Sequence, residues 1–136
     1  MTKEDLINIA KNAKKNALAT TTGYKVGAAL LTKSGNVYIG CNVEEYSILS
    51  LSNCAERVAI QNAISCGERE FEAIAIVGGK GELPRDYAWP CGVCRQVMME
   101  FCNPKTFHVI TAISEEEYLD KTLEEMLPHG FGPSNL

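Results

Sequence analysis

The sequence predicts an α/β domain with three layers, helix–sheet–helix, around a central mixed sheet of five strands. Segments with apolar residues at helical spacing alternate with segments typical of strands, which is the pattern of such layered domains. A continuous apolar run over residues 73–77 is typical of a strand covered on both faces. At 136 residues the chain is expected to form a single domain over residues 1–136.

The first predicted elements are a helix and a β-hairpin. Apolar residues at helical spacing predict an amphipathic helix over residues 3–18, which the polar stretch 20–23 ends. These apolar residues are Leu6, Ile9, Ala10, Ala13 and Ala17. Two further segments, 26–31 and 36–41, flank the turn-forming pair Ser34-Gly35 and therefore predict a hairpin.

A second helix is predicted in the middle of the chain. Asn53 is expected to cap a helix that begins near Cys54, because Asn is a favoured residue at that position. The helix is expected to run to Cys66 and to stop at Gly67.

The remaining elements follow the buried strand. Residues 78–89 are rich in Gly, Pro and charge, and predict a loop. Pro90 is expected to begin a helix over residues 91–101. A strand over residues 107–113 and a short helix over residues 120–127 complete the prediction.

Charge and hydropathy exclude some classes of partner. The formal net charge is −4, which argues against binding to nucleic acid, since that affinity rests on clustered Lys and Arg. The densest basic stretch, Lys11 to Lys15, is interpreted as a solvated helix face. No apolar run is long enough to span a bilayer, and no signal peptide precedes residues 1–5, so a cytoplasmic protein without a membrane partner is expected.

The most specific pattern combines three cysteines with one glutamate. Cys54 and Glu56 stand two residues apart, and Cys91 and Cys94 follow in a Pro-Cys-x-x-Cys segment. This arrangement resembles the zinc site of deaminases, in which the glutamate is a proton shuttle and not a ligand. Three sulfur ligands leave one tetrahedral position open, which is typical of catalytic zinc. The three other cysteines fit no ligand spacing and are interpreted as buried small apolar residues; they are Cys41, Cys66 and Cys102.

The chemistry expected of this pattern is hydrolysis. Zinc makes a water molecule acidic near neutral pH, and Glu56 would move its proton to a ring nitrogen and then to a leaving amine. Three thiolates around one Zn²⁺ carry a net charge of −1, so positive potential must offset them. Arg57 is a candidate to donate hydrogen bonds to these thiolates; the alternative is an ordinary surface arginine.

Over most of its length the chain resembles the small homotetrameric cytidine deaminases, in which the first zinc ligand is cysteine. The shared segments are Val26 to Leu30, Gly40 to Glu44, Cys54 to Arg57, Pro90 to Gln96, Leu127-Pro128 and Phe131 to Pro133. The resemblance implies one Zn²⁺ per chain, hydrolysis of cytidine and deoxycytidine in pyrimidine salvage, and a tetramer whose subunits share active sites.

The same resemblance assigns roles in substrate binding. It implies that Asn42 and Glu44 bind the ribose hydroxyls and that the backbone of Ala55 binds the base edge. Tyr24 stands where the family usually has a Phe that packs near the nucleoside. Phe131 corresponds to an aromatic residue that reaches the base-binding site of a neighbouring subunit.

Several departures from the family pattern leave the exact substrate open. Residues 45–49 differ from the usual sequence after the ribose motif, and the segment 79–89 is longer than usual. A second hypothesis is therefore deamination of another aminopyrimidine nucleoside, such as blasticidin S. A nucleotide substrate would need a cationic phosphate pocket, for which Lys25 and Arg85 are the candidates.

Two hypotheses from other classes stay open. One is a non-catalytic zinc-binding module for protein interaction, which would need a fourth zinc ligand. The other is a redox dithiol formed by Cys91 and Cys94, which would hold no zinc.

Overall fold

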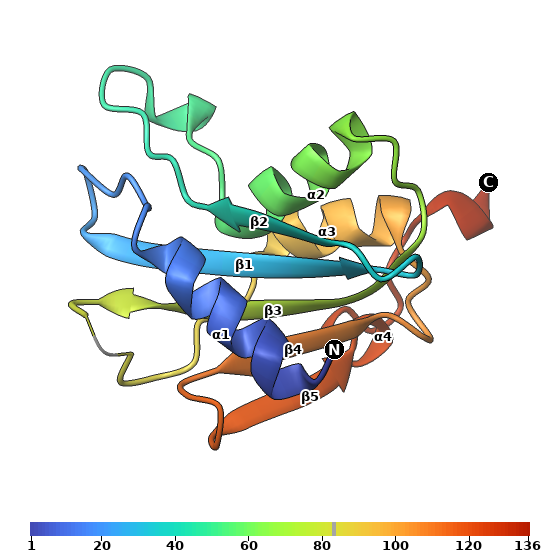
Figure 1. Ribbon diagram of the computed structural model, residues 1–136. Coiled ribbons are helices and arrows are strands. Elements are labelled where there is room, and N and C mark those ends of the chain that lie inside the picture. The colour runs from blue at the N-terminus through green and yellow to red at the C-terminus, as the bar shows by residue number, and fades with distance from the viewer. Residues whose placement is uncertain (83) are drawn as a thin grey trace.

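The protein is described by a computed structural model that covers residues 1–82 and 84–136. A five-stranded sheet has the order β2-β1-β3-β4-β5, with only β3 and β4 parallel (Figure 1). Its strands are β1 Tyr24–Thr32, β2 Val37–Cys41, β3 Phe71–Lys80, β4 His108–Ala112 and β5 Tyr118–Thr122. The helices are α1 Lys3–Lys14, α2 Ala55–Ser65, α3 Gly92–Phe101 and α4 Leu123–Met126, with 3₁₀ turns η1 Leu49–Leu51 and η2 Pro133–Asn135.

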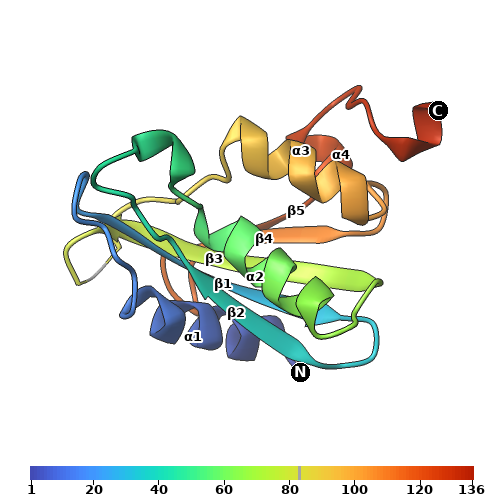
Figure 2. The same ribbon diagram turned by 90° about the horizontal axis from the view of Figure 1, so that it is seen from above.

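Helices cover both faces of the sheet, so the three-layer prediction is confirmed. Figure 2 shows α1 on one face and α2, α3 and α4 on the other. Successive strand residues point to opposite faces. In β1, Ala28 and Leu30 accordingly belong to the core beneath α2 and α3, whereas Ala29 packs against α1. No described helix, in either stretch of the chain, has the length and apolar character needed to cross a membrane.

Two glycines let helices lie directly on the sheet. A Cβ at Gly27 would lie 2.1 Å from the carbonyl oxygen of Ala10 in α1. A Cβ at Gly40 would lie 2.3 Å from the carbonyl oxygen of Ala55 and 2.5 Å from the nitrogen of Ala59. The absence of a side chain at Gly40 therefore sets how close the first turn of α2 comes to the sheet.

Replacing Gly40 by Ala should destabilise the fold. The added methyl group meets backbone atoms, so α2 must move, and we expect the free energy of unfolding to fall by about 2–3 kcal/mol. Urea unfolding measures this change. Gly92→Ala is the matched control, because its Cβ would meet nothing within 4 Å. An equal loss in both variants would contradict a specific contact between Gly40 and α2.

Some predicted boundaries were wrong near the termini. The first helix ends at Lys14, not at residue 18, because Leu18 bridges to the chain beside β2, where its nitrogen donates to the oxygen of Asn42 at 3.0 Å. The fifth strand includes residues 120–122, which were expected to be helical. Only Leu123–Met126 forms the helix, and the Thr122 side chain caps it.

Two more expectations near the site were wrong. Cys54, not Asn53, is the N-cap of α2; Asn53 instead donates its side-chain Nδ2 to Gln61 at 2.8 Å. Strand β3 continues to Lys80, beyond the expected end at residue 77, because β1 pairs with it along its whole length. The loop that leads to α3 therefore begins only after Lys80.

Candidate metal centre and active site

Three cysteine thiols meet where the N-termini of α2 and α3 come together. Cys54 is the N-cap of α2, Cys91 is the N-cap of α3, and Cys94 lies in the first turn of α3. The Sγ atom of Cys91 lies 3.9 Å from that of Cys54 and 3.5 Å from that of Cys94. All three sulfur atoms lie within 4.8 Å of one another. The predicted ligand set is thus brought together from two segments far apart in the sequence.

The spacing of the thiols fits zinc. Sulfur atoms bound at 2.3 Å to one tetrahedral zinc lie about 3.8 Å apart, close to the separations observed here. Across residues 1–82 and 84–136, no His, Asp or Glu joins this three-sulfur group. His108 instead lies in β4, with its Nδ1 2.9 Å from Oδ1 of Asp120. The group can therefore hold one zinc ion with three protein ligands and one open position.

The polar groups around the thiols favour negative charge on sulfur. Nη2 of Arg57 lies 3.4 Å from Sγ of Cys54, and the backbone nitrogen of Cys94 donates to Sγ of Cys91 at 3.4 Å. A hydrogen bond from the Cys94 thiol, together with Arg57, lowers the pKa of Cys54 to about 5. The same interaction with Cys54 raises the pKa of Cys94. These contacts thus stabilise the thiolate of Cys54, and thiolate is the form that binds zinc.

Glu56 is buried next to the thiols. Its side chain lies in the first turn of α2, and the residue is 4% exposed. Burial raises the pKa of its carboxyl group to about 7, and the nearby charge of Cys54 adds to the shift. A carboxyl group in this setting can both accept and release a proton near neutral pH, as acid–base catalysis needs.

The two residues predicted to bind ribose contact strand β1 and the turn before it. The side chain of Asn42 accepts from the nitrogen of Val26 at 2.9 Å and donates to the oxygen of Tyr24 at 2.8 Å. Glu44 accepts from the backbone nitrogen of Thr22 at 2.9 Å and from its hydroxyl at 2.5 Å. These bonds lower the pKa of the Glu44 carboxyl group.

The other predicted contact residues differ in their surroundings. Ala55 is buried at the start of α2. Tyr24 begins β1, where burial and then the charges of Asp86 and Glu56 raise the pKa of its hydroxyl. Phe131 is 61% exposed, and its carbonyl oxygen accepts from Nε2 of Gln96 on α3 at 2.8 Å. The structure therefore joins the backbone of Phe131 to α3 but leaves its ring in solvent.

The cysteines outside the metal cluster differ from one another. Cys102 is buried as expected, and burial raises its pKa to about 12. Cys41 is half-buried, whereas Cys66 is exposed. The expectation of a buried apolar role is therefore wrong for Cys66, which is the C-cap of α2.

Sequence reasoning missed the residues that hold the segment before Cys91. Nε of Arg95 donates to the oxygen of Pro90 at 2.8 Å, and Nη1 donates to the oxygen of Met126 at 2.7 Å. The buried hydroxyl of Thr111 donates to the oxygen of Ala88 at 2.9 Å. Of these residues, only Arg95 could have been suspected from the sequence of holding this segment, because it directly follows Cys94.

Comparison with known proteins matches both the sequence and the fold. Residues 1–110 match the family described as the cytidine and deoxycytidylate deaminase zinc-binding region. A cytidine deaminase from Sporosarcina psychrophila is 40% identical over 133 residues, covering 98% of this chain and 93% of that protein. A blasticidin-S deaminase from Bacillus cereus is 30% identical over 128 residues, covering 91% of this chain and 88% of that protein.

A solved structure extends this similarity to three dimensions. The crystal structure of cytidine deaminase from Burkholderia pseudomallei is 42% identical in sequence and superimposes with a TM-score of 0.87. The superposition covers 96% of this chain and 100% of the crystallised one.

Proposed function

The chain belongs to the family of cytidine and deoxycytidylate deaminases, and from this membership we propose that Glu56 and the three-cysteine zinc site hydrolyse cytidine and deoxycytidine. The products are uridine or deoxyuridine, and ammonia. The observation that carries the proposal is the buried carboxyl group of Glu56 beside three thiols with an open fourth position. A structural zinc module would have a fourth protein ligand and no need for this carboxyl group.

The reaction is hydrolysis at C4 of the pyrimidine ring. When bound by the three cysteines, zinc supplies a Lewis acid that makes an attacking water acidic near neutral pH. Glu56 accepts a proton from this water and delivers it to N3 of the ring. Glu56 then carries a second proton to the amino group, which leaves as ammonia while a carbonyl forms at C4. A pKa of about 7 allows the Glu56 carboxyl group both to accept and to release a proton near neutral pH.

Comparing substrates tests this function against the second hypothesis. Zinc-loaded protein should convert cytidine, with loss of its ultraviolet band, much faster than blasticidin S. The carboxylate of Glu44 and the second N–H of the Asn42 amide suit the hydroxyls of a free ribose, which favours cytidine as the substrate. The 30% identity to a blasticidin-S deaminase makes that antibiotic the proper comparison. Turnover of blasticidin S but not cytidine would reverse the substrate assignment.

Arg57 is proposed to stabilise the zinc ligands. Its guanidinium group is half-buried, and its hydrogen bond to Cys54 offsets the excess negative charge of three thiolates. Removing a group that hydrogen-bonds to a metal ligand typically lowers the affinity for the metal by about 10–100-fold. Arg57→Gln should therefore lose zinc to a competing chelator at about tenfold lower concentration.

The matched control for Arg57 is Arg69→Gln. Arg69 lies at the surface and donates to backbone oxygens at the end of α2, away from the thiols. The Arg69→Gln variant should retain zinc as well as the unaltered protein does. Equal retention by the Arg57 variant would assign Arg57 to the helix surface instead.

A homotetramer with shared active sites is proposed from the large apolar side chains that the single chain exposes. They are Ile48, Leu49 and Leu51 around η1, Val93 and Phe101 on α3, and Phe131. An interface between subunits would bury apolar side chains that are exposed in the single chain. Closed symmetric assembly would bring the ring of Phe131 to a neighbouring subunit. Sedimentation should show a tetramer, and a fully active monomer would refute the shared sites.

A reducing compartment, such as the cytoplasm, is also proposed. Zinc binding requires the three thiols to stay reduced, and the sulfurs of Cys91 and Cys94 lie close together. Oxidation of this pair to a disulfide would remove two ligands at once.

A further inference from the structure

Four lysines line a cavity on the face of the sheet opposite the thiols. Lys11, Lys14 and Lys15 come from α1 and its C-cap, and Lys25 comes from β1. Gly81 and Glu82 complete the lining, and the cavity has a volume of about 550 Å³. We name these four residues the lysine cluster.

Strand alternation separates the lysine cluster from the catalytic site. Lys25 points to the same face of β1 as Gly27, whose missing Cβ faces α1, because the two residues are two positions apart. The thiols and Glu56 lie on the other face, with α2 and α3. Lys25 is therefore a poor candidate for binding the phosphate of a nucleotide in the catalytic site.

Lys14 is the buried member of the cluster. It is 5% exposed, and its Nζ donates to the oxygens of Gly81 at 2.8 Å and Glu82 at 3.3 Å. An ammonium group has three N–H donors, and within residues 1–82 and 84–136 these two bonds use two of them. Burial and the charge of Lys25 lower the pKa of Lys14, whereas the charge of Glu82 acts in the opposite direction.

The charges of the lysine cluster are not neutralised by ion pairs. Within residues 1–82 and 84–136, the ion pairs are those of Asp120 with Lys3 and His108. Lysines suit the negative end of a helix dipole, and this accounts for part of the cluster in α1. That dipole end is worth only about half a charge, however, and Glu82 adds one negative charge. Four lysines therefore leave roughly +2.5 charges at this cavity.

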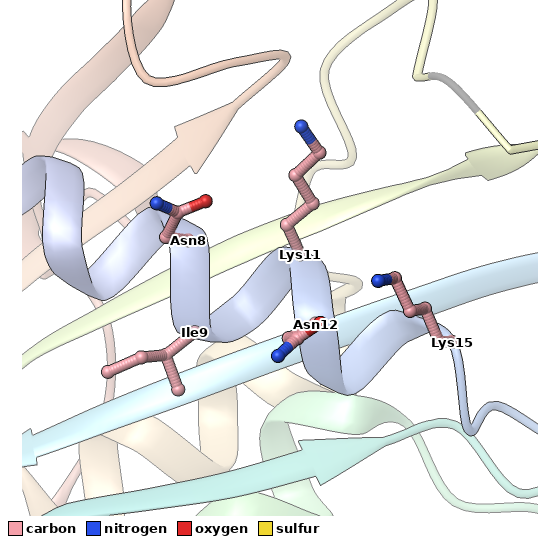
Figure 3. Close-up of a pocket in the computed structure, with 5 residues that line it drawn as sticks. All are labelled: Asn8, Ile9, Lys11, Asn12 and Lys15. Atoms are coloured by element: carbon pink, nitrogen blue, oxygen red, sulfur yellow. The ribbon is translucent and has the colours of Figure 1, made fainter.

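The cationic side chains extend into the solvent-facing part of this region. Figure 3 shows a neighbouring pocket on α1, where Lys11 and Lys15 of the lysine cluster stand one turn apart and line the pocket with Asn8, Ile9 and Asn12. Like charges at this spacing repel each other on a helix. A bound anion would turn this repulsion into a favourable interaction.

We propose that this cavity binds a polyphosphate group, either free or as part of a nucleotide. Three or four closely spaced negative charges match the local excess, and the volume lies in the range of small-molecule sites. A membrane surface or nucleic acid is disfavoured, because an extended polyanion would also meet the net charge of −4. A small ligand is affected mainly by charges within about 8 Å at physiological ionic strength.

Titration calorimetry with sodium tripolyphosphate tests the proposal. The zinc-loaded protein should bind one tripolyphosphate per chain, more weakly as salt concentration rises. Lys25→Gln should weaken binding by about tenfold or more, because one charge-assisted hydrogen bond is lost. Lys25 is exposed, so this variant is expected to fold normally.

The matched control is Lys33→Gln, an exposed lysine in the hairpin turn outside the cavity. Its affinity should stay within about twofold of the unaltered protein. Tripolyphosphate can also withdraw zinc, but that heat would be equal in both variants. Equal affinities of the two variants, or no saturable binding, would overturn the proposal.

Adenosine triphosphate distinguishes the two sources of the ligand. Affinity equal to that of tripolyphosphate would assign recognition to the phosphates alone, and tighter binding would add the nucleoside. Cytidine hydrolysis is measured in the same preparations. An active enzyme that binds no polyphosphate would refute this site without affecting the proposed deaminase activity.

Discussion

Replacing Glu56 by Gln should abolish cytidine hydrolysis while one zinc ion stays bound per chain. The amide has nearly the same shape as the carboxyl group, so the buried site at the start of α2 is preserved. It cannot accept a proton, however, and both proton transfers then lack their carrier. We expect the rate to fall by about 10³-fold or more, near the upper range for loss of an acid–base group. Loss of the cytidine ultraviolet band measures the rate.

A surface glutamate provides the control for this experiment. Glu116 is exposed in the turn between β4 and β5, and Glu116→Gln should keep full activity. Zinc content is measured in both variants. If the Glu56 variant kept more than about a tenth of the activity, another group would have to move the protons.

The second large effect is expected for Cys94→Ser. The residue is fully buried, and its sulfur is one of the three proposed zinc ligands, so we expect substoichiometric zinc and no measurable deamination. A metal present at a hundred times its dissociation constant stabilises the folded state by about 2.7 kcal/mol. The free energy of unfolding should therefore fall by about 3 kcal/mol. Metal analysis and urea unfolding measure the two effects.

Cys66→Ser is the matched control, because Cys66 is exposed at the other end of α2. It should keep one zinc per chain and full activity. The two variants also test the redox hypothesis, in which Cys94 forms a dithiol with Cys91 and no zinc is bound. Unaltered protein that contains no zinc, yet cycles between a dithiol and a disulfide, would favour that alternative.

The layered fold and the ligand cluster were predictable from local patterns. Residues 73–77 are continuously apolar, and the structure buries them in the centre of the sheet. The spacing of Cys91 and Cys94 is that of one helical turn, so their proximity followed once a helix was assigned. The three cysteines were grouped by their chemistry, and the sulfur separations in the structure agree with that grouping.

Features that depend on tertiary contacts were not predictable. Residues 120–122 have no strong strand pattern in the sequence. They form part of β5 because they pair antiparallel with β4. Cys54 replaces Asn53 as the N-cap because Asn53 pairs its backbone with Val43. The lysine cluster combines residues of α1 and its C-cap with a residue of β1. These residues line one cavity because α1 packs closely on β1 at Gly27, a contact that the sequence alone does not show.

The placement of β3 between the two ligand-bearing helices has a consequence during biosynthesis. Cys91 follows Cys54 by 37 residues, and the intervening segment contains the central strand β3. At 5–20 residues per second, the ribosome needs about 2–7 s to cover that distance. During this interval Cys54 is the only one of the three proposed zinc ligands that has been synthesised. Metal loading is therefore a late event of synthesis, and the supply of zinc matters only after α3 has emerged.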